Sequence, residues 1–300
     1  MQRIILDTDI GTDVDDALAL ALALRSPEIV LEGVTTVYGD VDIRARLVKK
    51  LMHLANRHDV CVYKGIEKPL LQNREVFWAG HEELLLSNHE AFDIEDRHAV
   101  DFIIDKIMSN PGEITLVPIG PLTNIAVAII REPRIVEHVK EIILMGGVTR
   151  LGNNGIELPP IEHNVKCDPE AASLVFSSGA PIVMVGLDVT MKVRITSKEK
   201  DELYASGDPL NIALAQSIEK WLRFRGKDWT AMHDPLAVSL LVDRSIVQTQ
   251  RMNIRVEYDH RHPTGQTVAV FSEDANVEIG LEVDNERFIR LLMDRLLAQN

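Results

Sequence analysis

Short apolar runs alternate with longer helical patterns through the first two thirds of this 300-residue chain, and this alternation constrains the fold most strongly. Each run ends in a polar or glycine-containing turn, which is typical of strands that lead into helices. A repeated strand–helix order predicts a mostly parallel α/β sheet. The predicted strands lie at 3–6, 30–36, 114–118, 142–145 and 182–185.

Helical patterns fill the stretches between these runs, and two helix starts carry capping signals. Asp168 before Pro169 is typical of an N-cap followed by proline at the first helical position, and Ser197 with Glu199 indicates a second start. Ligands bind beyond the carboxyl ends of strands in open α/β sheets, so the residues after each run are candidate site residues. The predicted helices span 15–25, 44–55, 99–109, 122–131, 168–176, 197–228 and 284–297, with strands between 248 and the last helix.

The charge balance limits the possible partners. Lys and Arg number 32 against 46 Asp and Glu, a net charge of −14. This excess of acids argues against nucleic acid as a partner, because binding phosphates requires a basic surface. The hydrophobic fraction of 46% is that of a globular protein, and no stretch resembles a linker or a repeat. We therefore expect one domain over residues 1–300.

Cysteine usage and apolar run lengths predict where the protein resides. Cys61 and Cys167 cannot build a disulfide framework, and the first residues lack the pattern of a secretory leader. The longest apolar run, 17–24, is far shorter than the roughly 20 residues of a membrane-spanning helix. We expect a cytoplasmic protein with no membrane role.

The strongest local signal is an acidic cluster in the first strand–helix unit. The segment RIILDTDIGTDVDDALAL runs from an apolar strand through Asp7, Asp9, Asp13, Asp15 and Asp16 into a helix. Capping of the helix explains Asp15 and Asp16, since its dipole favours a negative charge by about 0.3–1 kcal/mol. Asp7 and Asp9 would point the same way and repel, unless a cation or shared protons offset their charge. All-oxygen donors predict a hard divalent cation, Ca²⁺ or Mg²⁺.

Two known types of site share part of this pattern. An EF-hand loop follows a helix, whereas a strand precedes this cluster, so that interpretation fails. Haloacid-dehalogenase phosphatases also begin with a strand that ends in Asp-x-Asp. In those enzymes Thr or Val usually stands where this chain has Gly11, and their scheme has no use for Asp13, Asp15 and Asp16. A phospho-aspartyl intermediate at Asp7 would identify the phosphatase alternative.

Motifs along nearly the whole chain resemble the inosine-uridine nucleoside hydrolase family, which opens with a strand, DTDxGxDD and an Ala-rich helix. Matching segments follow in order: TTVYGD at 35–40, PIGPLTNIA at 118–126, LMGGV at 144–148, EHN then DPEAA within 162–172, VGLDVT at 185–190 and HDPLAV at 233–238. The resemblance implies a doubly wound, mostly parallel sheet with helices on both faces. It also implies Ca²⁺-dependent cleavage of ribonucleosides into ribose and base, usually by homodimers or homotetramers.

The resemblance also implies a role for individual residues. Asp9 would ligate Ca²⁺ and act as general base on the attacking water, with Asp7 supporting the site. Asp16 would be a bidentate ligand, and Asp15 would accept hydrogen bonds from ribose hydroxyls. The other implied residues are the Thr123 main-chain carbonyl and Asp234 as ligands, Met145, Glu162 and Asn164 at the ribose, His233 facing the leaving base, and Asp40 and His81 at the substrate.

The chemistry of glycosidic cleavage agrees with this assignment. The reaction passes through a ribosyl cation, so the site needs electron-rich groups around the sugar, an activated water and a way to neutralise the base. Histidine titrates near neutrality and can protonate a base, which suits His233. Glu162 and Asn164 would point to one side in extended backbone, with His163 pointing elsewhere.

The sequence departs from the family pattern at two places. Asp15 and Asp16 lie two residues further from Asp9 than is common, so Asp13 could replace either of them. Asp40 stands where most members carry Asn, which adds negative charge near the sugar. Both differences indicate a distinct subfamily.

Several residues also have a purely structural interpretation. His233 could be a helix-capping feature. His81 either lines the site or packs a loop. For Trp221 and Trp229, packing on a helix face is favoured over stacking on a base. Cys167 is typical of a small side chain that fills space in the core. We expect residues 151–160 to form the long loop at the site.

These observations predict a Ca²⁺-dependent hydrolase that splits ribonucleosides into ribose and free base in nucleoside salvage. A modified nucleoside or another N-riboside is the nearest alternative substrate. A nucleoside-binding protein without turnover is the alternative from a different class.

Overall fold

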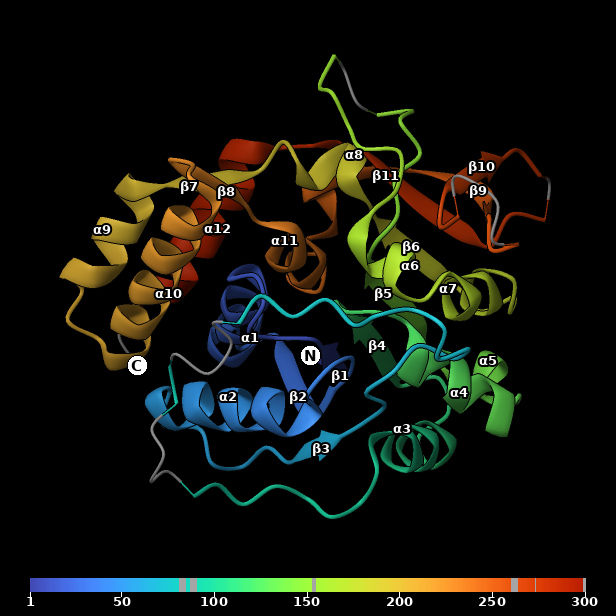
Figure 1. Cartoon of the computed structure of the whole chain (residues 1–300), viewed down its shortest axis with the longest axis horizontal. Coiled ribbons are helices and arrows are strands. Elements are labelled where there is room, and N and C mark those ends of the chain that lie inside the picture. The colour runs from blue at the N-terminus through green and yellow to red at the C-terminus, as the bar shows by residue number, and fades with distance from the viewer. Residues whose placement is uncertain (81–84, 87–90, 153–154, 260–263, 273, 299–300) are drawn as a thin grey trace.

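A nine-stranded, mostly parallel sheet organises the chain (Figure 1). The computed structural model describes residues 1–80, 85–86, 91–152, 155–259, 264–272 and 274–298. The strand order is β10-β9-β11-β6-β5-β4-β1-β2-β3, and only the pairings of β9 with β10 and β11 are antiparallel among those described. The strands are β1 (Gln2–Thr8), β2 (Ile29–Thr36), β3 (Val62–Lys64), β4 (Ile114–Pro118), β5 (Glu141–Met145), β6 (Ile182–Val185), β9 (Val247–Val256), β10 (Thr267–Val270) and β11 (Val277–Val283). A separate antiparallel pair joins β7 (Arg194–Thr196) and β8 (Trp229–Ala231).

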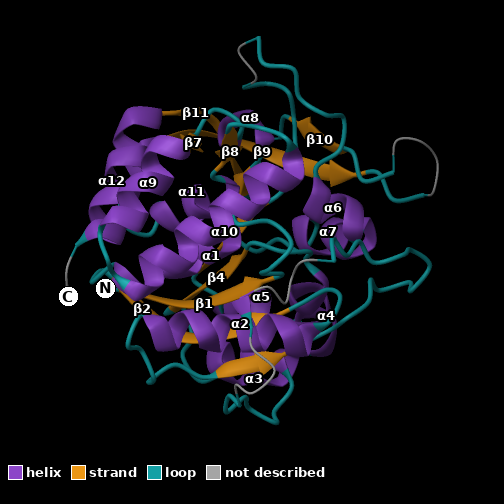
Figure 2. Ribbon diagram, turned by 60° about the vertical axis from the view of Figure 1, so that its left-hand side comes forward, coloured by secondary structure: helices purple, strands orange, loops and turns teal. Residues whose placement is uncertain are grey.

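Helices cover both faces of the sheet (Figure 2). Strand side chains alternate between two hydrophobic cores: Ile4 and Leu6 of β1 belong to one, and Ile5 belongs to the other. The first core is closed by α1 (Asp15–Arg25), α2 (Val41–Leu54), α9 (Ser197–Ala205), α10 (Pro209–Arg225), α11 (His233–Ser239) and α12 (Asn285–Leu297). The second is closed by α3 (Ala99–Met108), α4 (Thr123–Arg131), α5 (Ile135–His138) and α7 (Pro169–Phe176), while the short α6 (His163–Cys167) and α8 (Leu187–Thr190) follow loops after β5 and β6. This arrangement confirms the predicted fold class.

The structure corrects three local expectations. The predicted helix at 197–228 is two helices, because Asp208 caps a new helix whose first residue is Pro209. The cap of α9 is Thr196 rather than Ser197, and it forms a capping box with Glu199. The sequence analysis missed β3, since three residues are too few to show a periodic pattern. Within the described residues, no helix has the length and apolar character needed to cross a membrane.

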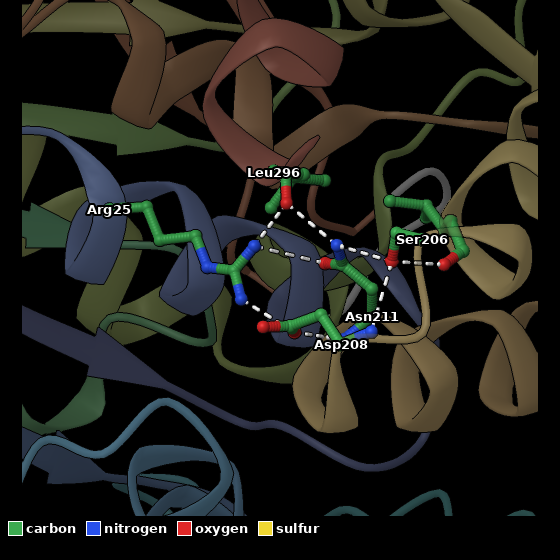
Figure 3. Close-up of polar contacts among 6 residues, drawn as sticks. Arg25, Ser206, Asp208, Asn211 and Leu296 are labelled. Atoms are coloured by element: carbon green, nitrogen blue, oxygen red, sulfur yellow. Dashed lines mark hydrogen bonds and ion pairs between the residues drawn. The ribbon is translucent and has the colours of Figure 1, made fainter. Parts of the chain in front are cut away.

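A buried arginine fixes the end of α1 that lies far from the acidic cluster (Figure 3). The side chain of Arg25 is 4% exposed and donates hydrogen bonds to Asp208 Oδ1 at 2.6 Å, to Asn211 and to the Leu296 carbonyl. Asn211 also donates to the Leu296 carbonyl, at 2.7 Å, and to Ser206 Oγ at 3.1 Å. These contacts join the last turn of α1 to the start of α10 and the last turn of α12.

We expect the substitution Arg25→Met to lower the free energy of unfolding by about 1–3 kcal/mol, because it leaves buried acceptors without their donor. Chemical denaturation measures this difference. Arg251→Met is the control, since Arg251 is 73% exposed and its contact with Glu278 is 3.6 Å long; its effect should stay below about 0.5 kcal/mol. Equal effects of the two substitutions would contradict this account.

Candidate active site

The site lies at the carboxyl ends of the parallel strands. Asp7, near the end of β1, pairs with Thr35 of β2 and with Pro118 of β4, so the segments that follow these strands meet at one edge of the sheet. A cavity of about 530 Å³ opens there. Its walls include Asp9, Asp13, Asp15, Asp16, Phe77, Met145, Pro159, Glu162, His163, Asn164, Lys166, Trp221, Phe224, Arg225, His233 and Asp234.

Three buried carboxylates converge in this cavity. Asp15 and Asp16 come from the first turn of α1, and Asp234 comes from the first turn of α11. One carboxylate oxygen of each lies within 4.8 Å of the others. Asp15 Oδ2 also accepts a hydrogen bond from the Asp234 main-chain N–H at 3.2 Å. Asp9 lines the same cavity and is 6% exposed, although its carboxylate is outside this closest group.

The cluster is electrostatically unfavourable without a counter-charge. Burial raises the pKa of Asp16 well above its ordinary value, and the charges of Asp9 and Asp15 raise it further. Burial likewise raises the pKa of Asp234, and every neighbouring aspartate adds to that effect. Burial and Asp15 do the same to the pKa of Asp13. Five carboxylates of one sign in a poorly solvated site favour protonation or a bound cation.

The donor set fits a hard divalent cation. The converging atoms are carboxylate oxygens, which suit Ca²⁺ or Mg²⁺ better than Zn²⁺. Asp7, two residues before Asp9, accepts hydrogen bonds through Oδ1 from Thr35 Oγ1 at 2.5 Å and from Asn124 Nδ2 at 2.7 Å. Its Oδ2 is buried and has no hydrogen-bond partner among the described residues. Burial raises the pKa of Asp7 to about 7.

The loop between β4 and α4 packs directly on Asp9. A Cβ at Gly120 would lie 2.7 Å from Asp9 Oδ1, so only glycine permits this approach. Thr123, the first residue of α4, is buried, and its hydroxyl donates to Asp168 Oδ2 at 2.7 Å. Thr123 is not among the residues that line the described cavity, and the position of its main-chain carbonyl as a ligand stays a prediction.

Glu162 and Asn164 line the cavity as expected, but their backbone is not extended. Glu162 caps the short helix α6, and its carboxylate accepts hydrogen bonds from the main-chain N–H groups of Asn164 at 2.7 Å and Gly147 at 3.0 Å. Asn164 donates to the main-chain carbonyls of Ile119 and Met145. The segment is helical rather than extended, so His163 also faces the cavity, contrary to expectation.

One predicted substrate contact, Asp40, has a different place in the structure. Asp40 is exposed and caps α2, where its Oδ1 accepts hydrogen bonds from the N–H groups of Asp42 at 3.1 Å and Ile43 at 3.0 Å. The unsatisfied N–H groups of the helix start hold this carboxylate, and Asp40 is not among the residues that line the described cavity. His81 lies outside the described residues.

His233 and the aromatic residues of α10 form another part of the cavity wall. His233 Nδ1 lies 2.7 Å from Thr190 Oγ1, and burial lowers the pKa of the imidazole below its ordinary value. Trp221 packs as predicted, with Nε1 donating to Thr230 Oγ1 at 3.1 Å, yet its ring also lines the cavity. Trp229 stacks instead against the guanidinium of Arg194.

The cavity also contains residues that the sequence analysis did not predict. Phe77 comes from the segment after β3, while Lys166 and Arg225 lie near the ends of α6 and α10. Phe77 and Arg225 lie outside the motifs quoted above, and Lys166 lies between EHN and DPEAA, where the pattern assigns it no role. Of the predicted loop at 151–160, Pro159 reaches the cavity.

We expect the substitution Asp234→Asn to stabilise the metal-free protein by about 1–3 kcal/mol, because it removes a buried charge among other carboxylates. The folded-state pKa of Asp234 is raised above the ordinary 3.8. The unfolded chain therefore releases this proton first, and wild-type stability falls as pH rises above about 4. The gain from Asp234→Asn should thus grow with pH.

Thermal unfolding in a chelator across pH 5–8 measures this gain. Asp201→Asn is the control, since the Asp201 side chain is 70% exposed. A destabilised Asp234→Asn, or a gain that shrinks with rising pH, would contradict the electrostatic account.

Comparison with known proteins assigns the chain to a family. The family model for inosine-uridine preferring nucleoside hydrolases matches residues 4–290. The pyrimidine-specific ribonucleoside hydrolase RihB of Escherichia coli O1:K1 is 34% identical, covering 96% of this chain and 94% of that protein. A plant nucleoside hydrolase structure superposes with a TM-score of 0.90 at 30% identity and covers 99% of both chains. A purine-preferring ribonucleoside hydrolase from Gardnerella vaginalis gives 0.88 at 31% identity, covering 99% of this chain and 98% of that one.

The match spans the acidic cluster, the glycine-containing loop that packs on Asp9 and the α11 start that carries Asp234. The chain therefore belongs to the inosine-uridine preferring nucleoside hydrolase family and is a hydrolase of N-glycosidic bonds.

Proposed function

We propose that this chain is a Ca²⁺-dependent ribonucleoside hydrolase that releases ribose and free base and serves nucleoside salvage. The observation that carries the proposal is the convergence of buried carboxylates with His233 in one cavity at the strand ends. A donor set made only of oxygen atoms suits Ca²⁺. A cavity of about 530 Å³ has room for a nucleoside.

Asp9 is proposed to activate the nucleophile. A cation held by Asp9, Asp16, Asp234 and the Thr123 carbonyl would orient and acidify the attacking water when bound. The water oxygen bonds to the anomeric carbon while Asp9 takes the proton of this water. At the same time, the bond from the anomeric carbon to the base nitrogen breaks. The base leaves with the electron pair of the broken bond.

The sugar and the base are handled by different walls of the cavity. Asp15 is proposed to accept hydrogen bonds from ribose hydroxyls, while Met145, Glu162 and Asn164 hold the rest of the sugar. These electron-rich groups stabilise the positive charge that develops on the ribosyl group. His233 is proposed to donate a proton to the departing base, and its hydrogen bond with Thr190 orients the ring.

We expect the substitution Asp9→Asn to lower kcat about 10²–10⁴-fold, the usual contribution of a general base. Release of reducing sugar from a panel of ribonucleosides with Ca²⁺ present measures the loss, and Asp201→Asn should keep wild-type turnover. A wild-type protein that binds nucleosides but releases no sugar from any of them would instead identify a binding protein. A phosphate mimic trapped covalently on Asp7 would identify a phosphatase.

We expect His233→Ala to lower kcat at least about 100-fold on nucleosides, whose bases leave poorly without a proton. The same substitution should cost much less on 4-nitrophenyl riboside, because its leaving group needs no proton. Comparing kcat on the two substrates separates proton donation from a structural role. An equal loss on both substrates would contradict the assignment of His233.

A modified nucleoside or another N-riboside is the second candidate substrate. Lys166 and Arg225 line the cavity, and two cations there would favour a substrate that carries an acidic group. A panel that includes modified nucleosides and N-ribosides with acidic groups distinguishes the two candidates by relative kcat/KM.

We further propose that the enzyme is cytoplasmic and forms homodimers or homotetramers. Light scattering measures the assembly directly.

A further inference from the structure

Arg44 is a buried cation that the proposed mechanism does not use. It is fully buried, lies in the first turn of α2, and is the largest of the fully buried side chains that the structure describes. Burying a guanidinium is costly unless every face of it is compensated. The groups that bind the guanidinium of Arg44 therefore indicate which segments this side chain holds together.

One side of the guanidinium binds the main chain of the Asp loop, which we define as residues 9–14. Arg44 Nη1 donates to the carbonyl oxygens of Asp9 and Ile10, the latter at 2.7 Å, and Nη2 lies 3.4 Å from Thr12 Oγ1. The positive charge also attracts the carboxylates of Asp9 and Asp16. These contacts lie on residues 9–12, the first part of the loop that leads to Asp13, Asp15 and Asp16.

The other side of Arg44 binds the segment that follows β2. Its Nε donates to the Tyr38 carbonyl at 2.5 Å, and the ring of Trp78 lies 5.1 Å from the guanidinium carbon. Tyr38 has a φ of 64°, and Tyr38 Oη accepts a hydrogen bond from the Phe77 N–H at 2.9 Å. Phe77 forms part of the cavity wall. Arg44 thus connects the Asp loop to the segments that carry Phe77.

The helix that carries Arg44 is itself fixed at this position. Asp40 caps α2 through its side chain, and the Arg44 N–H donates to the Asp40 carbonyl at 3.2 Å. The residue that replaces the family's usual Asn is therefore part of the structure that places Arg44.

We propose that Arg44 is a positioning residue for the reaction: its guanidinium holds the Asp loop so that the Asp9 carboxylate keeps one geometry relative to the cavity wall. This proposal rests on the proposed function, because it assumes that Asp9 acts on the nucleophile and contributes to the cation site. Lysine cannot replace arginine here, since one ammonium cannot span carbonyls on two separate segments in a fixed plane.

The test compares Arg44→Lys and Arg44→Gln with Arg25→Lys. Arg25 is a matched control because its side chain is also nearly buried and also donates to a main-chain carbonyl, at the opposite end of α1 (Figure 3). Three quantities are measured: the Ca²⁺ concentration that gives half of the maximal rise in melting temperature, kcat for the best nucleoside, and KM for the same nucleoside.

We expect Arg44→Lys to lower kcat and to raise the Ca²⁺ midpoint by about 10–100-fold, the usual cost of losing a partner that orients a ligand. KM should change by less than about threefold, because the groups that bind the substrate stay in place. Arg25→Lys should lower the melting temperature yet keep kcat and the Ca²⁺ midpoint within about twofold of wild type.

The proposal is overturned if Arg44→Lys retains both kcat and the Ca²⁺ midpoint, or if Arg25→Lys loses them equally. Should the Arg44 variants fail to fold, Trp78→Leu decides, since it removes only the half-buried ring over the guanidinium; wild-type values then overturn the proposal. A wild-type protein that neither responds to Ca²⁺ nor turns over any nucleoside would instead overturn the proposed function.

Discussion

Mutual repulsion among buried carboxylates is the constraint on which the rest of the structure depends. Asp15, Asp16 and Asp234 come within 4.8 Å of one another, with Asp9 in the same cavity. A fold gains nothing from such a cluster unless a ligand of opposite charge compensates it. In the proposed function, the fold gives up stability at this edge of the sheet in exchange for a site that binds a cation and a sugar.

The surrounding elements keep this unfavourable cluster in place. The α1 helix packs against α11, so Asp15 and Asp234 approach each other from two helix starts, where the helix dipoles favour negative charge. Arg25 holds the opposite end of α1, and Arg44 binds the loop that precedes it. The cluster is thus held by contacts made outside it.

The sequence predicted the elements whose signals are local. The α1 helix lies at residues 15–25 as expected, because its Ala and Leu residues form a strong helical pattern between acids and Arg25. The positions of Asp7 and Asp9 followed from the rule that side chains cluster beyond parallel strand ends. Asp168 caps α7 as expected, with Pro169 at the first helical position.

The features that sequence reasoning missed depend on local helix starts or on contacts between distant segments. His163 faces the cavity because Glu162 starts a helix, and the spacing alone gave no sign of this. Asp40 turns toward α2 because the helix start offers free N–H groups, which compete with any contact to the sugar. Arg44 lies in an ordinary amphipathic helix, and only the folded chain shows that its guanidinium meets the Asp loop.

The most direct test of the central claim is a crystal structure with Ca²⁺ and a non-hydrolysable nucleoside analogue, with the ion located by anomalous scattering. The account predicts one peak bounded by Asp9, Asp16 and Asp234, at about 2.3–2.6 Å from their carboxylate oxygens, with ribose hydroxyls beside it. A cavity that binds the analogue without an ion among these carboxylates would contradict the account.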